Sequence, residues 1–353
     1  MGKERKAFSG AAGTKVEDFG WNESYRGKMF SAKRKICNAP LMNYRGWRGP
    51  ASRVERVSLM AKAAALWICC GVGLGSAEAE SSSAQRALDA ALSGTQAVGV
   101  VLDGQDGQLI AAVREAEAAR VASAPGSTLK PLFLMAALRM GRVRAETTVM
   151  CHGDLRIAGR DAACTHPREQ NVFDAERALA YSCNGWFASL ALRFAPEEAV
   201  GVLHAAGFGS RTGGVNGEEA GEVEVPRNDA EVQLLVLGLS GIRVTPLQLA
   251  RAYFRMGRGL DAEPVVKRGL EGSVAYGMAH NASTAESAAA RITIAGKTGT
   301  ASDAGEAWTH GWFAGMASRG REQVVVVIYL PRGNGADAAG LAQHFFAAWG
   351  RAR

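Results

Sequence analysis

The sequence predicts an α+β fold, in which helices pack on an antiparallel sheet and an all-helical insertion separates the strands. Alternating apolar residues predict a hairpin near the start of the folded region, formed by Ala97–Leu102 and Gln108–Val113. A β-branched run at Val324–Leu330 predicts a buried strand near the other end of the chain. Between these strands, residues 130–270 are largely helical in pattern. Strands at both ends with helices between them are typical of this architecture.

The remaining elements follow from local patterns along the chain. We expect a helix before the hairpin, a strand close to residue 300 and a helix that closes the fold. Two short helical stretches flank a polar triplet near residue 183. In chain order these elements are Ala84–Leu92, Ala175–Tyr181, Trp186–Phe194, Arg291–Ala295 and Ala336–Trp349.

The segment Ser127-Thr128-Leu129-Lys130 has the residues of a serine nucleophile with a lysine base. The turn signal Pro125-Gly126 and the apolar run Leu132–Leu138 predict that Ser127 begins a buried helix. Ser127 and Lys130 then share one helix face, and burial keeps the lysine amine neutral part of the time. The free N–H of Ser127 at the helix start can face an oxyanion. Taken alone, the pattern also fits an ordinary amphipathic helix.

A second cationic segment, Lys297-Thr298-Gly299-Thr300, follows the predicted strand at Arg291–Ala295. The glycine allows a substrate backbone to approach closely. The Lys297 amine and the Thr298 and Thr300 hydroxyls form a donor-rich edge suited to a terminal carboxylate, and the Thr300 N–H is a second oxyanion donor. Taken alone, the segment also fits a surface loop with a solvated lysine.

The polar triplet Ser182-Cys183-Asn184 lies between the two short helices. Ser182 is placed to relay a proton, and the Asn184 side chain is placed to bind a substrate amide. Taken alone, the triplet also fits a serine that caps a helix. The three segments together, in this order, indicate an acyl-transfer site in which lysine replaces histidine as the base.

The chain resembles the transpeptidase domain of penicillin-binding proteins, in the serine acyl-transferase family that includes the serine β-lactamases. The nucleophile segment Ala124–Pro131 resembles that of the class B, monofunctional type. Further similar segments are Gly241–Tyr253 and His310–Gly315, the latter followed by Val324–Leu330. The resemblance covers roughly residues 95 to 350.

The resemblance implies a β-lactamase/transpeptidase-like fold, a role for each site residue, and no metal or organic cofactor. Ser127 is the nucleophile, Lys130 its base, and Ser182 the relay to the leaving amine. The carboxylate of a peptidyl-D-alanyl-D-alanine terminus, or of a β-lactam, then binds to a segment that consists of Lys297, Thr298, Gly299 and Thr300, with Asn184 on the opposite wall. The implied partners are peptidoglycan stem peptides, β-lactams and other cell-wall synthesis proteins.

The residues leave several activities open within this family. The interval from Ser182 to Lys297 is short for a full-size transpeptidase. A transpeptidase, a carboxypeptidase, a β-lactam sensor and a structural partner without activity therefore remain candidates. A β-lactamase is disfavoured because Glu231, the one carboxylate considered as a hydrolytic base, is interpreted as a helix-surface charge.

The charge of the chain is concentrated in its first part. The net charge is +7, while residues 1–53 contain twelve Lys and Arg against four Asp and Glu, so the remainder sums to about −1. We therefore expect no nucleic-acid binding by the folded domain. Residues 1–59 are interpreted as a disordered basic tail or as a mis-annotated start before Met60.

Residues 60–79 have the pattern of an export signal. A positive start, an apolar run at Ala63–Leu74 and a small-residue exit favour a cleaved signal peptide over a retained membrane anchor. Residues 80–353 then form the catalytic domain, on the periplasmic or extracytoplasmic side of the membrane.

Three cysteines fall in the predicted domain: Cys151, Cys164 and Cys183. A disulfide between Cys151 and Cys164 and three buried reduced thiols are equally compatible with the sequence. Cys151, His152, Cys164 and His166 offer metal-ligand types. Their spacing matches no strong zinc pattern, so no metal is assigned.

Overall fold

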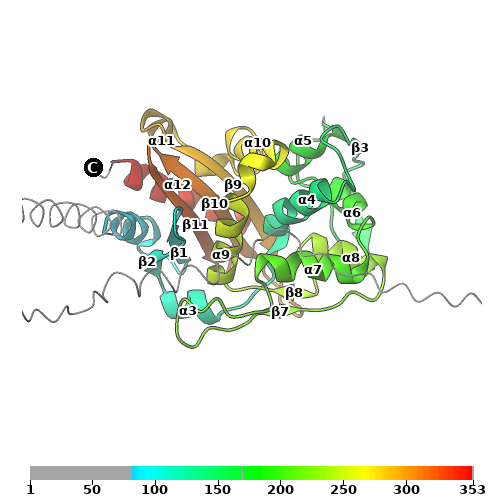
Figure 1. Cartoon of the computed structure of the whole chain (residues 1–353), viewed down its shortest axis with the longest axis horizontal. Helices are drawn as coiled ribbons and strands as arrows, with labels where there is room; N and C mark the ends of the chain where they lie inside the picture. Colours follow the sequence, from blue (N-terminus) through cyan, green and yellow to red (C-terminus); the bar gives the residue numbers. More distant parts are fainter. Residues whose placement is uncertain (1–81, 169, 352–353) are drawn as a thin grey trace, which may run out of the picture. The chain divides into compact units, whose positions relative to one another are not determined.

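The computed structural model describes residues 82–168 and 170–351. At its centre is a five-stranded antiparallel sheet in the order β2-β1-β11-β10-β9 (Figure 1). Its strands are β1 (Val98–Asp103), β2 (Leu109–Val113), β9 (Thr293–Ala301), β10 (His310–Arg319) and β11 (Glu322–Leu330). Strand β9 lies at the edge of the sheet, so its outer side faces the helical part of the molecule.

Strand β11 forms the middle of the sheet because both of its faces are apolar. All of its residues from Val324 to Tyr329 are buried, which suits a β-branched run covered on both sides. It pairs with β1 through Val100↔Val327 and with β10 through Ala314↔Val327. The prediction of a buried strand at Val324–Leu330 is confirmed.

One face of the sheet is covered by the helix at 82–92 and by α12 (Gly335–Arg351). Leu88 belongs to the same buried apolar cluster as Val326 and Phe346. The rings of Phe313 on the sheet and Phe346 on α12 meet edge to face, with centroids 6.0 Å apart. The first helix and α12 therefore form one layer, although they come from opposite ends of the domain.

Helix α9 (Pro246–Gly257) packs against β1, β10 and β11, and α10 (Pro264–Ala275) packs against the edge strand β9. Helix α9 begins with Thr245, whose hydroxyl accepts from the Gln248 N–H at 3.1 Å, while Gln248 accepts from the Thr245 N–H at 3.0 Å. This capping box, with proline at the first helical position, explains why the helix starts there.

The helical part of the molecule lies between β2 and β9 in sequence and beside the sheet in space (Figure 1). Its further helices are α3 (Glu115–Arg120), η1 (Gly126–Leu129), α4 (Lys130–Arg139), α5 (Ala175–Ala180), α6 (Asn184–Ala191), α7 (Pro196–Ala206), α8 (Asp229–Val236), η2 (Leu260–Ala262), η3 (His280–Ala282) and α11 (Ala285–Ala289). The α+β class with helices inserted between strands is confirmed.

The insertion is not all helical, which corrects the sequence prediction. Short strand pairs interrupt it: β3 (Val149–Met150) with β6 (Val172–Phe173), β4 (Arg156–Ile157) with β5 (Arg160–Asp161), and β7 (Glu222–Val223) with β8 (Ile242–Arg243). Ala158 and Gly159 have φ values of 48° and 80°, which form the tight turn that joins β4 to β5.

The predicted strand at Arg291–Ala295 also needs correction. Arg291 adopts φ 55°, and the strand begins at Thr293 and continues through the Lys297–Thr300 segment. The segment is therefore part of β9 and does not follow it. Predictions for residues 1–59 and for 60–79 fall on parts of the chain outside the described residues. Within the described residues, none of the helices combines the length and apolar character needed to cross a bilayer.

Candidate active site

Ser127 lies in η1, immediately before α4. In the run from Ser123 to Ala137 it is the one residue that is not buried. The short 3-10 turn thus leaves a single hydroxyl-bearing residue partly exposed at the start of an otherwise buried helix. This confirms the predicted start of a buried helix at Ser127.

The segment around Ser127 is held by its backbone. Gly126 adopts φ 56°, a conformation that favours glycine, and its N–H donates to the Gly238 carbonyl at 2.9 Å. On the other side of the serine, the buried Tyr253 hydroxyl donates to the Thr128 carbonyl at 2.9 Å. Both neighbours of Ser127 are therefore fixed by contacts from α9 and from the loop after α8.

Strand β9 approaches this segment so closely that only glycine fits at its contact point. A Cβ atom on Gly299 would lie 2.4 Å from the Pro125 carbonyl oxygen and 2.9 Å from Thr128 Cγ2. On the facing side, a Cβ atom on Gly126 would lie 2.9 Å from the Thr300 backbone nitrogen. The first and third sequence segments, some 170 residues apart, are thus in direct contact.

Lys130 connects the first segment to the second. Its side chain is fully buried, and its Nζ donates to the Ser182 carbonyl at 2.8 Å, to Ser182 Oγ at 3.2 Å and to Asn184 Oδ1 at 2.5 Å. Burial lowers the pKa of Lys130 from its ordinary value to about 8, partly offset by the nearby Cys164, Cys183 and Cys151 thiols. A buried amine with such a pKa is suited to accept a proton.

Ser182 and Asn184 are both in restrained positions. Ser182 adopts φ 55°, which costs a non-glycine residue about 1–2 kcal/mol and is tolerated only where surrounding contacts impose it. The Asn184 amide donates to the Ala162 carbonyl at 3.0 Å and to the Ala163 carbonyl at 3.3 Å. With Lys130 at its oxygen, the Asn184 side chain is engaged at both ends by the protein itself.

The third segment divides its side chains between two directions. Lys297 is fully buried and donates to the Thr298 carbonyl at 3.0 Å; burial, and then the charge of Lys130, lower the pKa of Lys297 well below its ordinary value. The Thr300 hydroxyl instead accepts from the Gly335 N–H at 2.9 Å, and the Thr298 hydroxyl donates to the Met278 carbonyl at 3.4 Å. The alternation of a strand therefore separates the lysine from the two threonines.

Sequence reasoning missed the residues that support the nucleophile segment. Besides Gly238 and Tyr253, a hydrogen-bond chain runs from Ser123 Oγ to the Tyr329 hydroxyl at 2.8 Å and on to His310 Nδ1 at 3.1 Å. His310 Nε2 also lies 3.2 Å from Asp303 Oδ2, and Asp303 Oδ1 accepts from the Ala124 N–H at 3.0 Å. Two of these residues could have been found from the sequence, because Tyr253 and His310 lie in Gly241–Tyr253 and His310–Gly315, two of the segments that carry the family resemblance.

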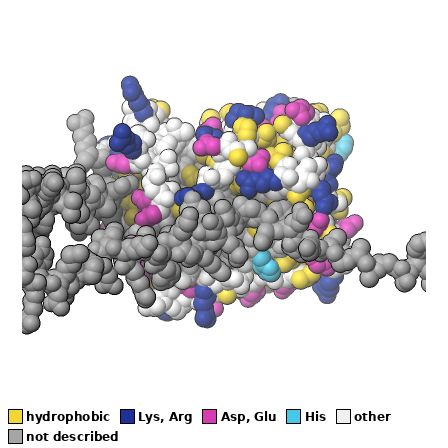
Figure 2. All heavy atoms as spheres, in the orientation of Figure 1, with side chains coloured by type: hydrophobic (Ala, Val, Ile, Leu, Met, Phe, Trp, Pro, Cys, Tyr) yellow, Lys and Arg dark blue, Asp and Glu magenta, His cyan; other side chains and the backbone are white. Residues whose placement is uncertain are grey.

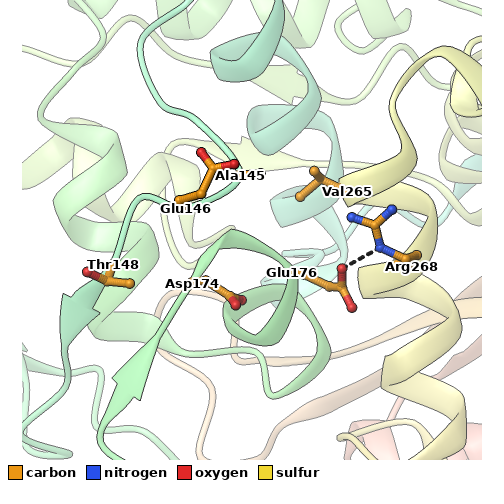
Figure 3. Close-up of a pocket in the computed structure, with 7 residues that line it drawn as sticks. All are labelled: Ala145, Glu146, Thr148, Asp174, Glu176, Val265 and Arg268. Carbon is orange, nitrogen blue, oxygen red and sulfur yellow. Dashed lines mark hydrogen bonds and ion pairs between the residues drawn. The ribbon is translucent and has the colours of Figure 1, made fainter.

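A separate cavity of about 310 Å³ lies on the helical side, between the loop after α4, the start of α5 and α10 (Figure 3). Its walls include Glu146, Asp174 and an ion pair between Glu176 and Arg268, whose Nε lies 2.6 Å from Oε2. Ser127, Lys130 and Lys297 do not line it. The cavity is therefore distinct from the site formed by the three segments.

Comparison with known proteins agrees with this geometry. The family model for the penicillin binding protein transpeptidase domain matches residues 97–348. Two curated relatives, each a peptidoglycan D,D-transpeptidase FtsI, from Escherichia coli strain K12 and from Escherichia coli O157:H7, are 31% identical over 135 residues. That match covers 38% of this chain and 22% of each relative, so it spans about a fifth of the relatives' length.

Solved structures show the same fold at low sequence identity. A peptidoglycan glycosyltransferase from Burkholderia ambifaria superposes with a TM-score of 0.64 at 20% identity, over 78% of this chain and 93% of that one. The transpeptidase domain of Burkholderia pseudomallei penicillin-binding protein 3 superposes with a TM-score of 0.63 at 20% identity, over 78% of this chain and 92% of that one. Pseudomonas aeruginosa PBP2 superposes with a TM-score of 0.64 at 20% identity, over 75% of this chain and 76% of that one. Since the family model matches well over half of its residues, this chain belongs to the penicillin-binding protein transpeptidase domain family.

Proposed function

We propose that this chain is a serine D,D-transpeptidase or D,D-carboxypeptidase that forms an acyl-enzyme through Ser127. Its substrates are the peptidyl-D-alanyl-D-alanine stems of peptidoglycan, and β-lactams acylate the same serine. The observation that carries this proposal is the buried Lys130, whose pKa is lowered to about 8. It lies one helical turn after Ser127, the one residue from Ser123 to Ala137 that is not buried, and bonds to Ser182.

In the acylation step, neutral Lys130 removes the proton of Ser127 while the serine oxygen attacks the carbonyl of the penultimate D-alanine. General-base assistance of this kind accounts for about 10²–10⁴ in rate. The backbone N–H groups of Ser127 and Thr300 stabilise the oxyanion. This role for Thr300 is supported by the close approach of β9 to the nucleophile segment, since a Cβ atom added to Gly126 would lie 2.9 Å from the Thr300 nitrogen.

In the second half of acylation, the peptide C–N bond breaks and terminal D-alanine leaves. The proton held by Lys130 passes to Ser182 Oγ, 3.2 Å away, and from there to the leaving amine. An acceptor amine, or water in the carboxypeptidase reaction, then attacks the acyl-enzyme. Transfer to an amine makes a cross-link, and transfer to water trims the stem.

The terminal carboxylate of the substrate binds along β9. Burial, and then the charge of Lys130, disfavour the charged form of the Lys297 amine and so lower its pKa. A carboxylate that entered beside Lys297 would supply a compensating negative charge. We also assign Thr298, Gly299 and Thr300 to this carboxylate site. The Thr298 and Thr300 hydroxyls, which bond to the Met278 carbonyl and the Gly335 N–H, would then exchange these partners for the substrate. Strand β9 is an edge strand, the kind of strand to which an extended peptide can pair.

We further propose that the domain works outside the cytoplasm, where stem peptides are found. Residues 60–79 would direct export as a cleaved signal peptide or attach the domain to the membrane as an anchor. Residues 80–353 would form the catalytic domain. N-terminal sequencing of the exported protein distinguishes the two. Where Figure 2 shows coloured side chains, Lys and Arg are interspersed with Asp and Glu, so the positive charge there is offset by negative charge, in line with the expectation of no nucleic-acid binding. We propose cell-wall synthesis proteins as partners from the family to which the chain belongs.

Labelling with a fluorescent penicillin tests the proposed nucleophile. We expect a stable adduct that Ser127→Ala abolishes, because the acylated oxygen is removed. The matched control is Ser240→Ala, an exposed serine after α8, which we expect to label as the parent does. Equal labelling of the parent and Ser127→Ala would overturn the assignment of the nucleophile.

Adduct decay and stem-peptide turnover then separate the remaining activities. Rapid loss of the adduct indicates a β-lactamase, and no adduct indicates a structural partner. A stable adduct together with release of D-alanine from a stem pentapeptide is the result we expect for an enzyme. A stable adduct without D-alanine release or transfer to an added amine indicates a β-lactam sensor.

A further inference from the structure

Four potential metal ligands meet beside the second segment of the site. Their ligand atoms, Sγ of Cys151, Cys164 and Cys183 and a ring nitrogen of His166, all lie within 4.8 Å of one another. Cys151 Sγ is 3.4 Å from Cys164 Sγ and 3.4 Å from His166 Nε2. All three cysteines are free. Three sulfurs and one imidazole nitrogen form one of the ligand sets of structural zinc sites.

The histidine is oriented with a lone pair toward the sulfurs. His166 Nδ1 lies 3.0 Å from the Pro167 carbonyl oxygen, which can only accept, so Nδ1 carries the hydrogen. Nε2 is then the unprotonated nitrogen, and it is the one that faces Cys151. A backbone carbonyl that fixes the tautomer in this way is the usual outer partner of a metal-bound histidine.

Each sulfur receives a backbone N–H. The donors are Gly153 to Cys151 at 3.4 Å, Asn184 to Cys164 at 3.1 Å, and Trp186 to Cys183 at 3.5 Å. Such bonds favour the thiolate form of cysteine, which is the form that binds metal. Gly153 lies in the loop after β3, whereas Asn184 and Trp186 lie at the start of α6, so the cluster is built by the tertiary fold.

The dimensions of the cluster suit a tetrahedral ion. Bonds of about 2.3 Å from zinc to sulfur place two tetrahedral sulfurs about 3.8 Å apart, close to the distance between Cys151 and Cys164. A disulfide would use only two of the three thiols and would leave the inward-facing His166 nitrogen without a role. Cys151, His166 and Cys183 are buried, so the ion would be shielded from solvent.

We propose that Cys151, Cys164, His166 and Cys183 bind one Zn²⁺ ion. Four protein ligands leave no open position, so the ion is structural and takes no part in the acyl transfer. Binding releases the thiol protons, since thiolates are the ligands. The ion joins the loop between β3 and β6 to the start of α6, and so holds Ser182 and Asn184, the two neighbours of Cys183, in place.

This proposal differs from the sequence prediction for a reason visible in the fold. The sequence offered Cys151, His152, Cys164 and His166, whose spacing matches no strong zinc pattern. In the structure His152 is exposed and outside the cluster, and Cys183 takes the fourth position from 17 residues further along the chain.

The test measures metal content and metal retention in the full chain, purified without a histidine tag and with a reductant. We expect one zinc per chain by elemental mass spectrometry. His166→Ala removes one ligand, and we expect zinc to be lost to a competing chelator at a concentration at least about 100-fold lower than for the parent. The matched control is His152→Ala, which changes the exposed histidine next to Cys151 and should leave retention unchanged.

Two further measurements keep the test decisive if His166→Ala fails to fold. His166→Cys restores a fourth ligand of a different type, and we expect it to retain zinc. Replacement of zinc by Co²⁺ in the parent should give the visible absorption of tetrahedral cobalt and the near-ultraviolet bands of cobalt thiolates.

Specific results would overturn the proposal. One is a zinc-free protein that takes up neither added Zn²⁺ nor Co²⁺. Another is a Cys151–Cys164 disulfide found by peptide mass spectrometry in protein purified from the oxidising compartment, with no metal bound. Equal chelator resistance in the parent and in a folded His166→Ala variant is a third. None of these readouts depends on acyl transfer, so the zinc site and the proposed function can fail separately.

Discussion

The two walls of the candidate active site are built by different means. The nucleophile wall, formed by η1 and β9, consists of backbone packed against backbone, with Gly126 and Gly299 at the contact. The cysteine wall, formed by the loop between β3 and β6 and the start of α6, depends on side chains: three thiols, one imidazole and the Asn184 amide. The first wall is part of the five-stranded sheet, whereas the second has only the two-residue strand pairs β3–β6 and β4–β5 and depends on a crosslink or a hydrogen-bond network.

Lys130 spans both walls, because it begins α4 on one side and bonds to Ser182 and Asn184 on the other. The proposed base, Lys130, is therefore positioned by the wall opposite its own serine, Ser127. A change in either wall should therefore slow acylation. A change in the nucleophile wall displaces Ser127, whereas a change in the cysteine wall displaces the amine of Lys130.

Gly299→Ala should give the largest effect, because it breaks the nucleophile wall. Its Cβ would lie 2.4 Å from the Pro125 carbonyl oxygen, so the backbone around Ser127 must move. A displacement of about 1 Å costs roughly 10²-fold in rate, and we expect that loss in the penicillin acylation rate constant. The control is Gly201→Ala in α7, where a Cβ meets nothing within 4 Å. Parent-like acylation by Gly299→Ala would show that the close contact is not needed.

The pH dependence of acylation tests the residue that spans the walls. The pKa of Lys130 is lowered to about 8, so at pH 7 about a tenth of the amine is neutral and able to act as a base. We expect the acylation rate constant to fall about tenfold per pH unit below pH 7 and to reach a plateau above pH 8. Stopped-flow labelling between pH 6 and 9 measures this. A rate independent of pH over that range would exclude Lys130 as the titrating base.

Tyr253→Phe should produce a smaller, stability-related effect on the nucleophile wall. It removes the buried hydroxyl that donates to the Thr128 carbonyl and leaves that acceptor unpaired. We expect the free energy of unfolding to fall by about 1–3 kcal/mol, measured by denaturant titration, with zinc content unchanged. Tyr276→Phe, at a tyrosine that is 48% exposed, is the control and should be neutral. A loss of zinc in Tyr253→Phe would show that the two walls are not independent.

Glu231→Gln should have no effect on the lifetime of the penicillin adduct. Glu231 belongs to neither wall: it lies in α8 and accepts from the Arg227 N–H at 2.9 Å and from the Arg227 guanidinium. Bonding to Arg227 lowers the pKa of Glu231 and engages its carboxylate within its own helix and cap. Glu219→Gln, at an exposed position, is the matched control. A longer-lived adduct in Glu231→Gln alone would identify Glu231 as a hydrolytic base.

Local pattern was sufficient where a residue's structure depends on its neighbours in the chain. The hairpin, the buried strand at Val324–Leu330 and the closing helix were predictable because apolar periodicity and β-branching act within a few residues. The start of β9 was misplaced because Arg291 adopts a left-handed conformation that no local pattern revealed. The strand pairs within 149–173 were missed because two-residue strands carry almost no periodicity.

For this protein, then, the sequence by itself determined the α+β class, the family and which residues carry hydroxyl, amine and amide groups in the three segments. Only the tertiary structure decided what these groups contact. It buried Lys130 and bonded it to Ser182, placed Gly299 against Pro125, and brought Cys183 to Cys151, Cys164 and His166. The physical reason is that pKa shifts, steric limits and metal geometry depend on distances between residues remote in the chain, and those distances exist only after folding.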